Sequence, residues 1–576
     1  MSGLFGTFNV AKRGMSAQQK ALDVTSHNVA NANTEGYSRQ RANMETTRPF
    51  GMPSMNNAMG PGQLGTGVQV SSIVRIRDTF LDYQIRTENG TTGWYEGREK
   101  FLSEIESIMN EPSDTGVSTL LSKVFKSWQV LSDSAESSNA RTVVAQQSKA
   151  LTDELNNTYN QLIKLKDNSQ KTIKQNVVDV NSMLNQINEL NKQVISVKIG
   201  GNEPNDLMDK RDLLVDQLST KFGITIDKKA LGGEDLKPDE TSGMGNAYLI
   251  KSNPNDEVRR FSYVSSIVPK DNQKPGKDGS YEVTYYKNGN MATDKNKVTM
   301  TMTLSAAEYK ELDQGRVLWS DNEGNAIKAD GSKIEDGASF TDLKLFSPAT
   351  GELKGFMSVQ ADIDKYVNEL NSLAKGIAFS INAVHSGESD ATKDKLMFFV
   401  NSELGGTEQE ITAGNISINK EILDDVMKIK VGQGDTPGAT NGYRALAIAK
   451  LRDVRLGIQS INVDTTRDGF LTGKFAQDAT LGVMMVKSDS NGMTVDGYFT
   501  DIVNRVGVDN QEAKRIVKNH EIVLANLDES RASISGVSLD EEMANMIQYQ
   551  HAYQANAKII STVDELLDLV INGLKR

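Results

Sequence analysis

The chain lacks cysteine altogether and has only four histidines in 576 residues. Without cysteine it can form no disulfide, no thiolate nucleophile and no cysteine-based metal site, so its stability must come from packing. His27, His385, His520 and His551 do not stand at the helical spacing that lets two imidazoles share a metal. We therefore expect no metal and no cofactor, and we interpret His520 as a histidine packed in a helical seam.

The chain also lacks long apolar runs and an excess of positive charge. No stretch approaches the roughly 20 consecutive apolar residues that cross a bilayer, and Met1 to Val10 shows no basic region followed by an apolar run. The net charge of -12 gives no overall attraction to nucleic acid or anionic lipid. These features predict no membrane anchor, no cleaved signal, and neither nucleic acid nor membrane as a partner.

Motifs that carry catalysis are incomplete. Residues 60–65 match the letters of a dinucleotide-binding loop, but no buried strand precedes them, and residues 468–475 lack the spacing and hydroxyl of a phosphate loop. Residues 321–325 resemble a calcium loop without glycine at the sixth position and are interpreted as an exposed turn. The charged cluster at residues 206–212 is interpreted as pairing on a helix surface, although it could also bind a neighbouring subunit. We predict that the chain is not an enzyme.

What the sequence does contain is a strong heptad pattern at its C-terminal end, which predicts one long amphipathic helix. Ser538 followed by Glu541 predicts a capping box at the start of this helix. Further apolar residues beside the main seam, such as Ile547, Leu566 and Val570, indicate that the helix has an additional partner. The seam comprises Leu539, Met546, Tyr553, Ile560, Leu567 and Leu574.

The N-terminal end of the chain carries a matching stripe. Apolar residues recur at spacing seven, with Ala11 and Thr25 in a second seam, and the helix is expected to fade within residues 27–36. An ordinary intramolecular helix pair explains both stripes, and assembly with neighbouring chains is the alternative. The N-terminal stripe comprises Phe8, Met15, Leu22 and Val29, and Leu4 stands in the second seam. Together with the C-terminal seam, these are the residues expected at an assembly interface.

Between the ends the pattern changes twice, which predicts a multidomain, mainly α chain with discontinuous domains. Paired terminal helices flank a discontinuous helical-bundle domain, and a β-rich domain with alternating runs and Asn-Gly and Asp-Gly turns is inserted at the centre. Residues 68–76 alternate enough to predict a strand, and helical spacing is predicted to resume at residues 446–451. Another heptad seam is predicted within residues 95–220, at Ile173, Val177, Val180, Leu184, Ile187 and Val194. The predicted domains are 1–48 with 536–576 (terminal helices), 49–94 (connector with a β-hairpin), 95–225 with 353–535 (helical, with an irregular, partly β insertion at 386–440) and 226–352 (β-rich outer domain).

Two stretches of the sequence resemble a known family. Residues 26–40, SHNVANANTEGYSRQ, are similar to the N-terminal signature of flagellar rod, hook and hook-associated proteins. Residues 533–546, SISGVSLDEEMANM, resemble the hook-associated protein 1 family in particular, and residues 205–214, NDLMDKRDLL, add a match inside the chain. The signature residues are Asn28, Asn31, Asn33, Gly36, Tyr37, Gly536, Ser538, Leu539 and Glu541.

The resemblance implies a structural subunit of the bacterial flagellum that is secreted by type III export. It implies a ring of copies of this chain at the extracellular hook-filament junction, required for filament assembly, with the terminal helices in the innermost tube. The implied partners are the chain itself, the hook protein, the second hook-filament junction protein and a cytosolic export chaperone. The chaperone is expected to bind Met546, Tyr553, Ile560 and Leu567.

Two alternatives stay open at this point. The chain could be another axial flagellar subunit, from the hook or the distal rod, because these share the Asn-rich N-terminal signature. It could also be a junction protein whose β-rich insert, residues 226–352, has an added adhesive or hydrolytic activity. No HExxH motif and no compact Ser/His/Asp set supports the hydrolytic reading.

Overall fold

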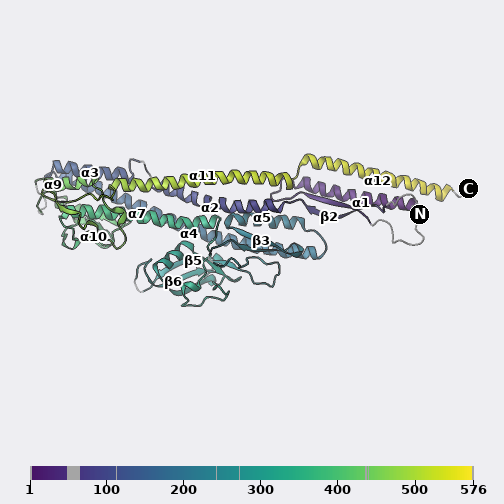
Figure 1. Cartoon of the computed structure of the whole chain (residues 1–576), viewed down its shortest axis with the longest axis horizontal. Coiled ribbons are helices and arrows are strands. Elements are labelled where there is room, and N and C mark those ends of the chain that lie inside the picture. Colours follow the sequence, from purple (N-terminus) through teal and green to yellow (C-terminus); the bar gives the residue numbers. More distant parts are fainter. Residues whose placement is uncertain are drawn as a thin grey trace. The chain divides into compact units, whose positions relative to one another are not determined.

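The computed structural model describes residues 3–47, 65–109, 111, 113–241, 243–270, 273–434, 438 and 440–573. These residues form two compact units, each assembled from separated parts of the chain (Figure 1). The mainly α fold class, with long terminal helices and a central β-containing region, is confirmed. The first unit comprises Met1–Trp94, Gln175–Lys354 and Lys518–Arg576, and the second comprises Tyr95–Lys174 and Gly355–Val517.

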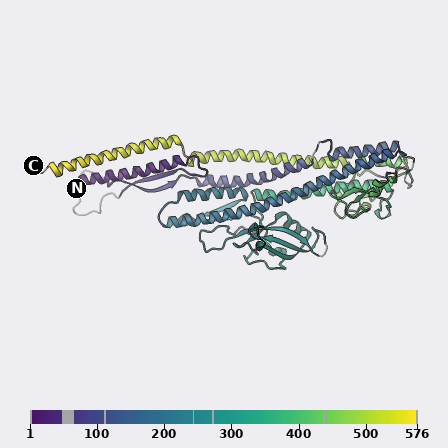
Figure 2. The same ribbon diagram turned by 180° about the vertical axis from the view of Figure 1, so that it is seen from behind.

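The two ends of the chain form an antiparallel helix pair in the first unit. α1 (Leu4–Ala30) and α12 (Leu539–Gly573) lie side by side in both ribbon views (Figure 1, Figure 2), with the two termini at the same end. α1 ends within the predicted interval, where the amide of Asn31 donates to the carbonyl of His27 at 3.1 Å and its side chain donates to the same carbonyl at 3.0 Å. Asparagine favours such a helix end because its side chain competes for backbone groups.

A β-hairpin follows α1 and leads into the next helix. β1 (Gln40–Thr46) pairs antiparallel with β2 (Val68–Arg75), with a register shift between Asn43 and Met44. β2 was predicted as a strand, whereas β1 lies before the predicted connector, because its sequence QRANMET is polar and carries little alternation. α2 (Thr79–Met109) begins inside the predicted connector.

The long interior helices follow the predicted heptad pattern. α4 (Ser138–Ile199) contributes residues to both units, and α5 (Asn205–Lys221) returns beside its C-terminal part in the first unit (Figure 1). The seam predicted for α4 is confirmed, since each of its residues is at most 1% exposed. Those residues are Ile173, Val177, Val180, Leu184, Ile187 and Val194.

The predicted β-rich interval holds a hairpin and a four-stranded antiparallel sheet. β3 (Ile224–Lys228) pairs with β4 (Glu234–Pro238), and the sheet has the strand order β7-β6-β5-β8. Its buried core includes Tyr281, Val283 and Met302. Asn288 adopts φ 55° at the predicted Asn-Gly turn after β6. The elements of the sheet are β5 (Arg260–Pro269), β6 (Gly279–Tyr286), β7 (Lys297–Leu304), α6 (Ala306–Gly315) and β8 (Val317–Ser320).

The second unit is helical with short strands at one end of its helices. α9 confirms the predicted return of helical spacing, but the next long helix, α11, begins only at Val495, so the irregular region extends beyond the predicted 386–440. Arg467 lies buried in this region and pairs with Asp394 at 3.0 Å and with Glu408. The elements are α3 (Val117–Asp133), α7 (Glu352–Ser386), β9 (Phe399–Asn401), β10 (Ile416–Ile418), α8 (Lys420–Asp424), α9 (Tyr443–Lys450), α10 (Arg467–Leu471), β11 (Phe475–Gln477), β12 (Met484–Val486) and α11 (Val495–Ser535). α7 and α11 also contribute residues to the first unit.

Among the described residues, no helix is long and apolar enough to cross a membrane. The same residues hold no cluster of His, Cys, Asp and Glu side chains arranged to bind a metal ion. Residues 321–325 form a turn, since Oδ1 of Asp321 accepts hydrogen bonds from the amides of Glu323 and Asn325, both at 2.9 Å. The turn is only partly exposed, because Asp321 and Gly324 are buried. Residues 60–64 of the dinucleotide-like stretch lie outside the described residues.

Candidate functional site

The candidate site begins where α1 and α12 approach each other. Gly14 lies against Asn556, and a Cβ atom added at this glycine would stand 2.7 Å from Oδ1 of Asn556. At this point α1 therefore meets α12 through a small residue, and the large apolar residues of the predicted stripe are only half-buried. The buried residues of α1 are Ala11, Gly14, Ala17, Ala21, Val24, Thr25 and Asn28, and the half-buried ones include Leu4, Phe8, Met15, Leu22 and Val29.

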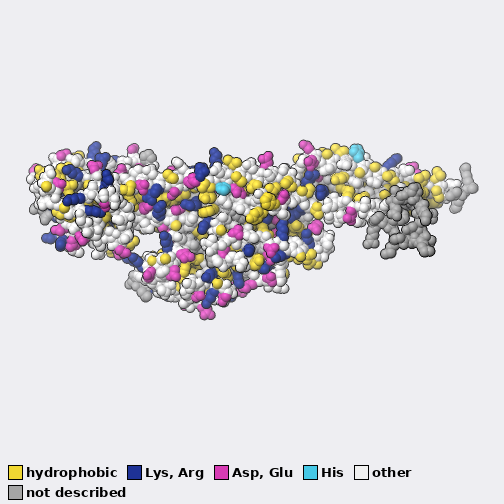
Figure 3. Space-filling view, viewed as in Figure 1, with side chains coloured by type: hydrophobic (Ala, Val, Ile, Leu, Met, Phe, Trp, Pro, Cys, Tyr) yellow, Lys and Arg dark blue, Asp and Glu magenta, His cyan; other side chains and the backbone are white. Residues whose placement is uncertain are grey.

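α12 is less covered than α1. Its described residues include only two buried side chains, Glu542 and Val563. Met546, Tyr553, Ile560 and Leu567 of the predicted seam are half-buried on the face that these two share, while Leu539 is 50% exposed and Leu574 lies outside the described residues. Figure 3 shows apolar side chains along the exposed side of the terminal pair. The exposed apolar flank of α12 comprises Met543, Ile547, Ile559, Leu566, Leu569, Val570 and Ile571.

Asn28 joins the two terminal helices to the turn that follows α1. It is 1% exposed, and its Nδ2 donates to the carbonyl of Gln40 at 2.9 Å and to Oε2 of Glu542 at 3.1 Å. Its Oδ1 accepts from the amide of Gln40 at 3.0 Å and from the hydroxyl of Tyr37 at 2.8 Å. Burial, followed by the nearby carboxylates of Asp206 and others, raises the pKa of Tyr37, so its hydroxyl remains a donor.

The other signature residues of this turn have distinct places. Gly36 has φ +76°, a left-handed conformation that glycine adopts without strain, and a Cβ atom there would stand 3.1 Å from Leu213 of α5. Asn31 caps α1, and Asn33 is exposed. The sequence patterns thus pointed to a turn in which Asn28 and Gly36 contact other elements directly, whereas Asn33 does not.

The C-terminal signature forms the break between α11 and α12. A Cβ atom at Gly536 would stand 2.3 Å from the carbonyl oxygen of Ala532, so only glycine fits this close turn. The amide of Glu541 donates to Oγ of Ser538 at 3.4 Å, which is half of the predicted capping box. Within the described part of the chain the other half does not form, because the Glu541 carboxylate accepts from Nη1 of Arg39 at 2.8 Å instead.

Arg39 locks the break against the turn after α1. Its amide donates to the carbonyl of Ser535 at 2.8 Å, and its Nε donates to Oε1 of Glu542 at 2.7 Å. Glu542 therefore receives hydrogen bonds from both Asn28 and Arg39 and is buried between them. These contacts fix the direction in which α12 leaves the body of the first unit.

An acidic face of α5 anchors this junction. Asp209 accepts from the amide of Ser38 at 3.0 Å and from Nη1 of Arg75 at 2.7 Å, and Asp212 accepts from the same Nη1 at 2.8 Å. Asp216 accepts from Arg86 at 2.6 Å. The interpretation of residues 206–212 as surface pairing was wrong for Asp209 and Asp212: both are 5% exposed, and their partners come from distant parts of the chain. Asp206 and Lys210 of the same cluster are exposed.

This α5 hub, defined as Asp209, Asp212 and Asp216 with their arginine partners, is electrostatically stabilised. Burial opposes the ionised form of Asp212, but Arg77, Arg75 and Arg86 outweigh it and lower the pKa of the carboxyl to about 2. Asp216 also accepts from Arg531 of α11 at 2.8 Å, just before the break to α12. The hub thus ties the hairpin, α2, α5 and α11 of the first unit together.

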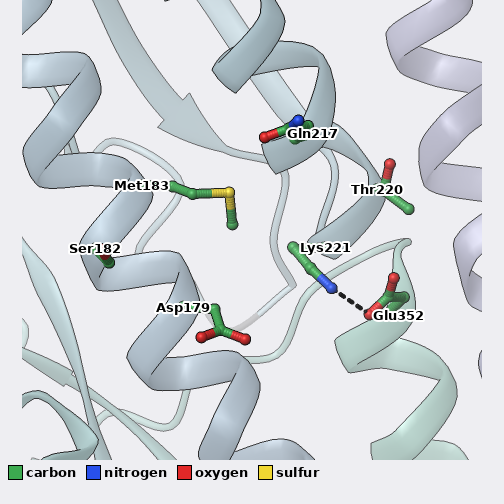
Figure 4. A pocket seen from close by; sticks show the side chains of 7 residues that line it. All are labelled: Asp179, Ser182, Met183, Gln217, Thr220, Lys221 and Glu352. Atoms are coloured by element: carbon green, nitrogen blue, oxygen red, sulfur yellow. Dashed lines mark hydrogen bonds and ion pairs between the residues drawn. The ribbon is translucent and has the colours of Figure 1, made fainter.

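A hollow of about 470 Å³ lies further along α5, between α4 and the start of α7 (Figure 4). Lys221 and Glu352 form an ion pair of 2.7 Å on one side, and Figure 4 shows Asp179 and Met183 of α4 on the opposite side. The hollow is open and contains no paired catalytic groups that would support acid-base chemistry.

The histidines occupy separate environments. His520 was expected to pack in an apolar seam, but its Nδ1 lies 2.5 Å from Oε1 of Glu88, and the seam residue Ile534 is 42% exposed. His520 is nevertheless half-buried and Ala513 of the seam is buried, so the imidazole is packed in part, with a carboxylate of α2 as its partner. His385 is fully buried in the second unit, where burial, followed by Lys430 and Arg444, lowers its pKa to about 3 and keeps it neutral.

The sequence reasoning missed the arginines of the hub. Arg75, Arg77 and Arg86 lie in the predicted connector, and Arg531 lies near the end of α11. The available signal was the spacing of the acidic residues on α5, which places Asp209, Asp212 and Asp216 on one helix face. Such a face requires cations from outside the helix.

Known proteins align with this chain over its full length. The family described as "Flagellar hook-associated protein FlgK helical domain" matches residues 102–242, and two rod families, "Flagella basal body rod protein" and "Flagellar basal body rod FlgEFG protein C-terminal", match residues 8–37 and 530–573. The flagellar hook-associated protein 1 of Bacillus subtilis (strain 168) is 32% identical and covers 100% of this chain and 99% of its own length.

A more distant relative also aligns over nearly the whole chain. The flagellar hook-associated protein 1 of Salmonella typhimurium is 26% identical over 98% of this chain and 99% of its own length. The solved structure of the flagellar hook junction protein FlgK from Burkholderia pseudomallei aligns with a TM-score of 0.48 and 13% identity over 79% of this chain and 100% of its own.

Proposed function

The chain belongs to the flagellar hook-associated protein 1 family, and on that premise we propose that it is a structural subunit of the hook-filament junction. In this proposal, copies of the chain form a ring on the distal hook, outside the cell, and filament assembly requires that ring. The observation that carries the proposal is the full-length similarity to the Bacillus subtilis relative, 32% identical over 100% of this chain.

The terminal helix pair supplies the proposed assembly surface. α12 leaves several large apolar side chains exposed, including Ile547 at 52% and Leu566 at 46%. Fully burying one such side chain contributes roughly 1.5–3 kcal/mol of free energy. Association with a neighbouring copy that covers several of these side chains is therefore favourable. The half-buried stripe of α1, including Phe8 and Met15, extends this surface. Assembly then completes burial that the isolated chain leaves unfinished.

The α5 hub supports the role of a rigid anchor for this pair. Its ion pairs are buried and come from four separate segments, so they hold the break before α12 in one geometry. A subunit that must place its terminal helices in register with those of its neighbours needs such an anchor. Removing one charge is expected to be costly because its partner is left buried and unpaired.

The proposed partners are further copies of this chain, the hook protein and the second hook-filament junction protein. A cytosolic export chaperone is proposed to bind Met546, Tyr553, Ile560 and Leu567 before secretion. Because these side chains are half-buried on the face toward α1, the chaperone competes with α1 for α12. Calorimetric titration tests this: deleting residues 1–30 should tighten chaperone binding, and unchanged affinity would contradict the competition.

We propose that the chain has no catalytic activity and binds no cofactor. The alternative of another axial subunit is disfavoured because the two rod families match only the terminal segments, whereas the hook-associated helical domain matches residues 102–242. No observation within the described residues favours an adhesive or hydrolytic role for the β-rich insert.

Deletion of the gene tests the proposed function. Cells without the protein should build completed hooks without filaments, as seen by electron microscopy, and should shed filament subunits into the culture medium. A plasmid copy of the gene should restore filaments. Normal filaments on the deletion strain would overturn the junction role.

A further inference from the structure

The two terminal helices of the first unit pair in one antiparallel register. Gly14 of α1 lies against Asn556 of α12, and Asn28 donates to Glu542 at 3.1 Å. The chain advances by the same number of residues from Gly14 to Asn28 as from Glu542 to Asn556, so the two contacts agree. Each residue of α1 therefore stands at a defined height along α12.

The charges exposed on this helix pair are not neutralised within the chain. In the register of those contacts, Lys12 stands at the same height as Lys558, which brings two like charges together. Glu565 and Asp568 stand about two to three turns nearer the C-terminus, and α1 carries no charge before Lys12. Asp23 lies about three turns after Lys12 on the same exposed face of α1.

None of these five side chains forms an ion pair with another residue that the structure describes, although all five are exposed. Asp23 and Asp568 accept hydrogen bonds only from amide side chains of their own helices, Gln19 at 3.0 Å and Asn572 at 2.6 Å. The charges are therefore available to a second molecule.

The opposite end of α12 differs in this respect. Glu541 and Glu542 both pair with Arg39 of the same chain, at 2.8 Å and 2.7 Å. Glu542 is also buried, which leaves Asp540 as the unpaired acidic residue of that end within the described part of the chain. The acidic charge that a neighbour can reach is thus gathered toward the C-terminal end of α12.

A second copy in the same orientation matches these charges when it is displaced along the helix axis. Lys12 and Asp23 are separated by nearly the same length of helix as Asp568 and Lys558, and the order of charges is complementary when the helices run antiparallel. A displacement of about ten residues, roughly 15 Å, sets Lys12 of one copy against Asp568 of the other and Asp23 against Lys558.

Exposed apolar side chains adjoin the charges on both helices. Leu569, next to Asp568, is 71% exposed, and Phe5, two turns before Lys12 on the same face of α1, is 69% exposed. Covering apolar area provides affinity, whereas charge pairs fix the register and reject other alignments. The alignment without displacement is rejected because it sets Lys12 against Lys558.

We propose that neighbouring copies of the chain pack α1 of one copy against the C-terminal end of α12 of the next, antiparallel and displaced by about ten residues. Lys12 pairs with the acidic end formed by Glu565 and Asp568, and Asp23 pairs with Lys558. The two surfaces differ, so the contact repeats from copy to copy around a ring or along a helical array. This inference rests on the proposed ring of copies and names the surfaces that join them.

Charge reversal tests the contact in cells. The α1 variant, Lys12→Glu with Asp23→Lys, reverses the order of charges on α1 without changing its net charge. The α12 variant, Lys558→Glu with Glu565→Gln and Asp568→Lys, reverses the order on α12. Either variant alone should lose most filaments and motility, because like charges then meet between copies. A chain that carries both variants should recover them.

Co-expression separates a contact between copies from a contact within one chain. A deletion strain that makes both singly reversed chains should regain part of its filaments, because α1 of one chain then meets α12 of the other with opposite charge. Recovery only when both variants are in one chain would place the contact within that chain and overturn the proposal. Full motility of either variant alone would also overturn it.

Cysteine cross-linking tests the displacement without changing any charge. The chain has no cysteine, so an introduced thiol is the only one in its chain. The displaced alignment brings Ser16 within about one turn of Ser561 of the next copy, whereas the alignment without displacement brings it level with Gln554. A short bismaleimide should therefore link Ser16→Cys chains to co-expressed Ser561→Cys chains in purified hook-filament preparations, and should link them far less to Gln554→Cys chains.

The outcomes separate this packing from the proposed function. Absence of linked dimers in both mixtures, or preferential linking to Gln554→Cys, overturns the displaced contact. If the deletion strain lacks filaments but the charge-reversed strains swim fully, the junction role stands and only the packing is wrong. Normal filaments on the deletion strain would reject the proposed function itself.

Discussion

The side chain of Asn28 in α1 donates a hydrogen bond to Oε2 of Glu542 in α12 across 3.1 Å. This contact joins residues from the two ends of the chain, and both are buried. Glu542 also accepts from Arg39, so one carboxylate connects the helix pair to the turn after α1. The direction of α12 therefore depends on a polar contact and not only on apolar packing.

Replacing Asn28 by alanine should destabilise the terminal pair by about 2–4 kcal/mol, because several buried donors and acceptors lose their partner at once. Hydrogen exchange of the α12 amides measures the effect, and faster exchange is expected in α12 with little change in the second unit. Asn33→Ala is the matched control, since Asn33 is an exposed asparagine of the same turn. Equal effects of the two substitutions would contradict the assigned role.

Asn28→Asp should be more harmful than Asn28→Ala. It places a second carboxylate beside Glu542 in a buried site, where like charges repel strongly. The added substitution Glu542→Gln should recover part of the loss, measured by the same exchange experiment. If Glu542→Gln recovers no stability, repulsion between the introduced aspartate and the Glu542 carboxylate is not the cause of the loss.

The contact of Gly14 with Asn556 leads to a third prediction. Gly14→Leu places a large side chain where even a Cβ atom stands 2.7 Å from Oδ1 of Asn556, so the helices must separate. We expect a loss of about 1–3 kcal/mol in stability of the pair, as in other overpacked contacts. Asn556→Ala should relieve part of it, which a double-mutant cycle measures. Additive effects of the two changes would mean that the side chains do not meet.

The helices that were predicted well are those with a strict apolar period. The seam of α4 was predicted correctly because residues such as Val180 and Ile187 are buried at every heptad position. In α1 the same logic selected Phe8 and Met15, but the face against α12 is built from smaller residues such as Gly14. Periodicity finds an apolar stripe, whereas the closest approach of two helices is set by side-chain size.

The polar contacts that join α5 to the β-hairpin could not be predicted from the sequence patterns. Asp209 of α5 binds Arg75 of the hairpin, and no local rule connects positions so far apart in the chain. The signature around Asn28 and Gly36 was found only through the resemblance to flagellar proteins, which did not indicate what the asparagine contacts. Tertiary pairing of buried charges depends on the complete fold and not on local propensity.

The lowered pKa of Asp212, about 2, predicts a pH dependence. Because the folded value lies below the ordinary value of 3.8, Asp212 contributes stability that is fully present above about pH 4 and lost as the pH falls through about 2. The contribution is on the order of 2 kcal/mol. Asp212→Asn should destabilise the first unit at pH 7, and its deficit against the unmodified chain should shrink between about pH 5 and pH 2.

Urea unfolding at a series of pH values, followed through exchange of the α5 amides, measures that deficit. Asp540→Asn is the control, since Asp540 is exposed at the start of α12. A deficit that stays constant across the acid range would show that ionisation of Asp212 does not stabilise the fold.

The exposed flank of α12 gives the most direct test of assembly. Ile547 and Leu566 are 52% and 46% exposed, so replacing either with glutamate should leave the fold of the isolated chain unchanged. In the assembled state, however, the charge would be buried against a neighbour, which costs several kcal/mol unless it is paired. Cells with either variant should therefore lose filaments and motility while secreting a normally folded protein, as judged by circular dichroism. A control strain with Gln554→Glu, at an exposed polar position of the same helix, should swim normally. Full motility of the Ile547→Glu and Leu566→Glu strains would exclude this flank from the interface.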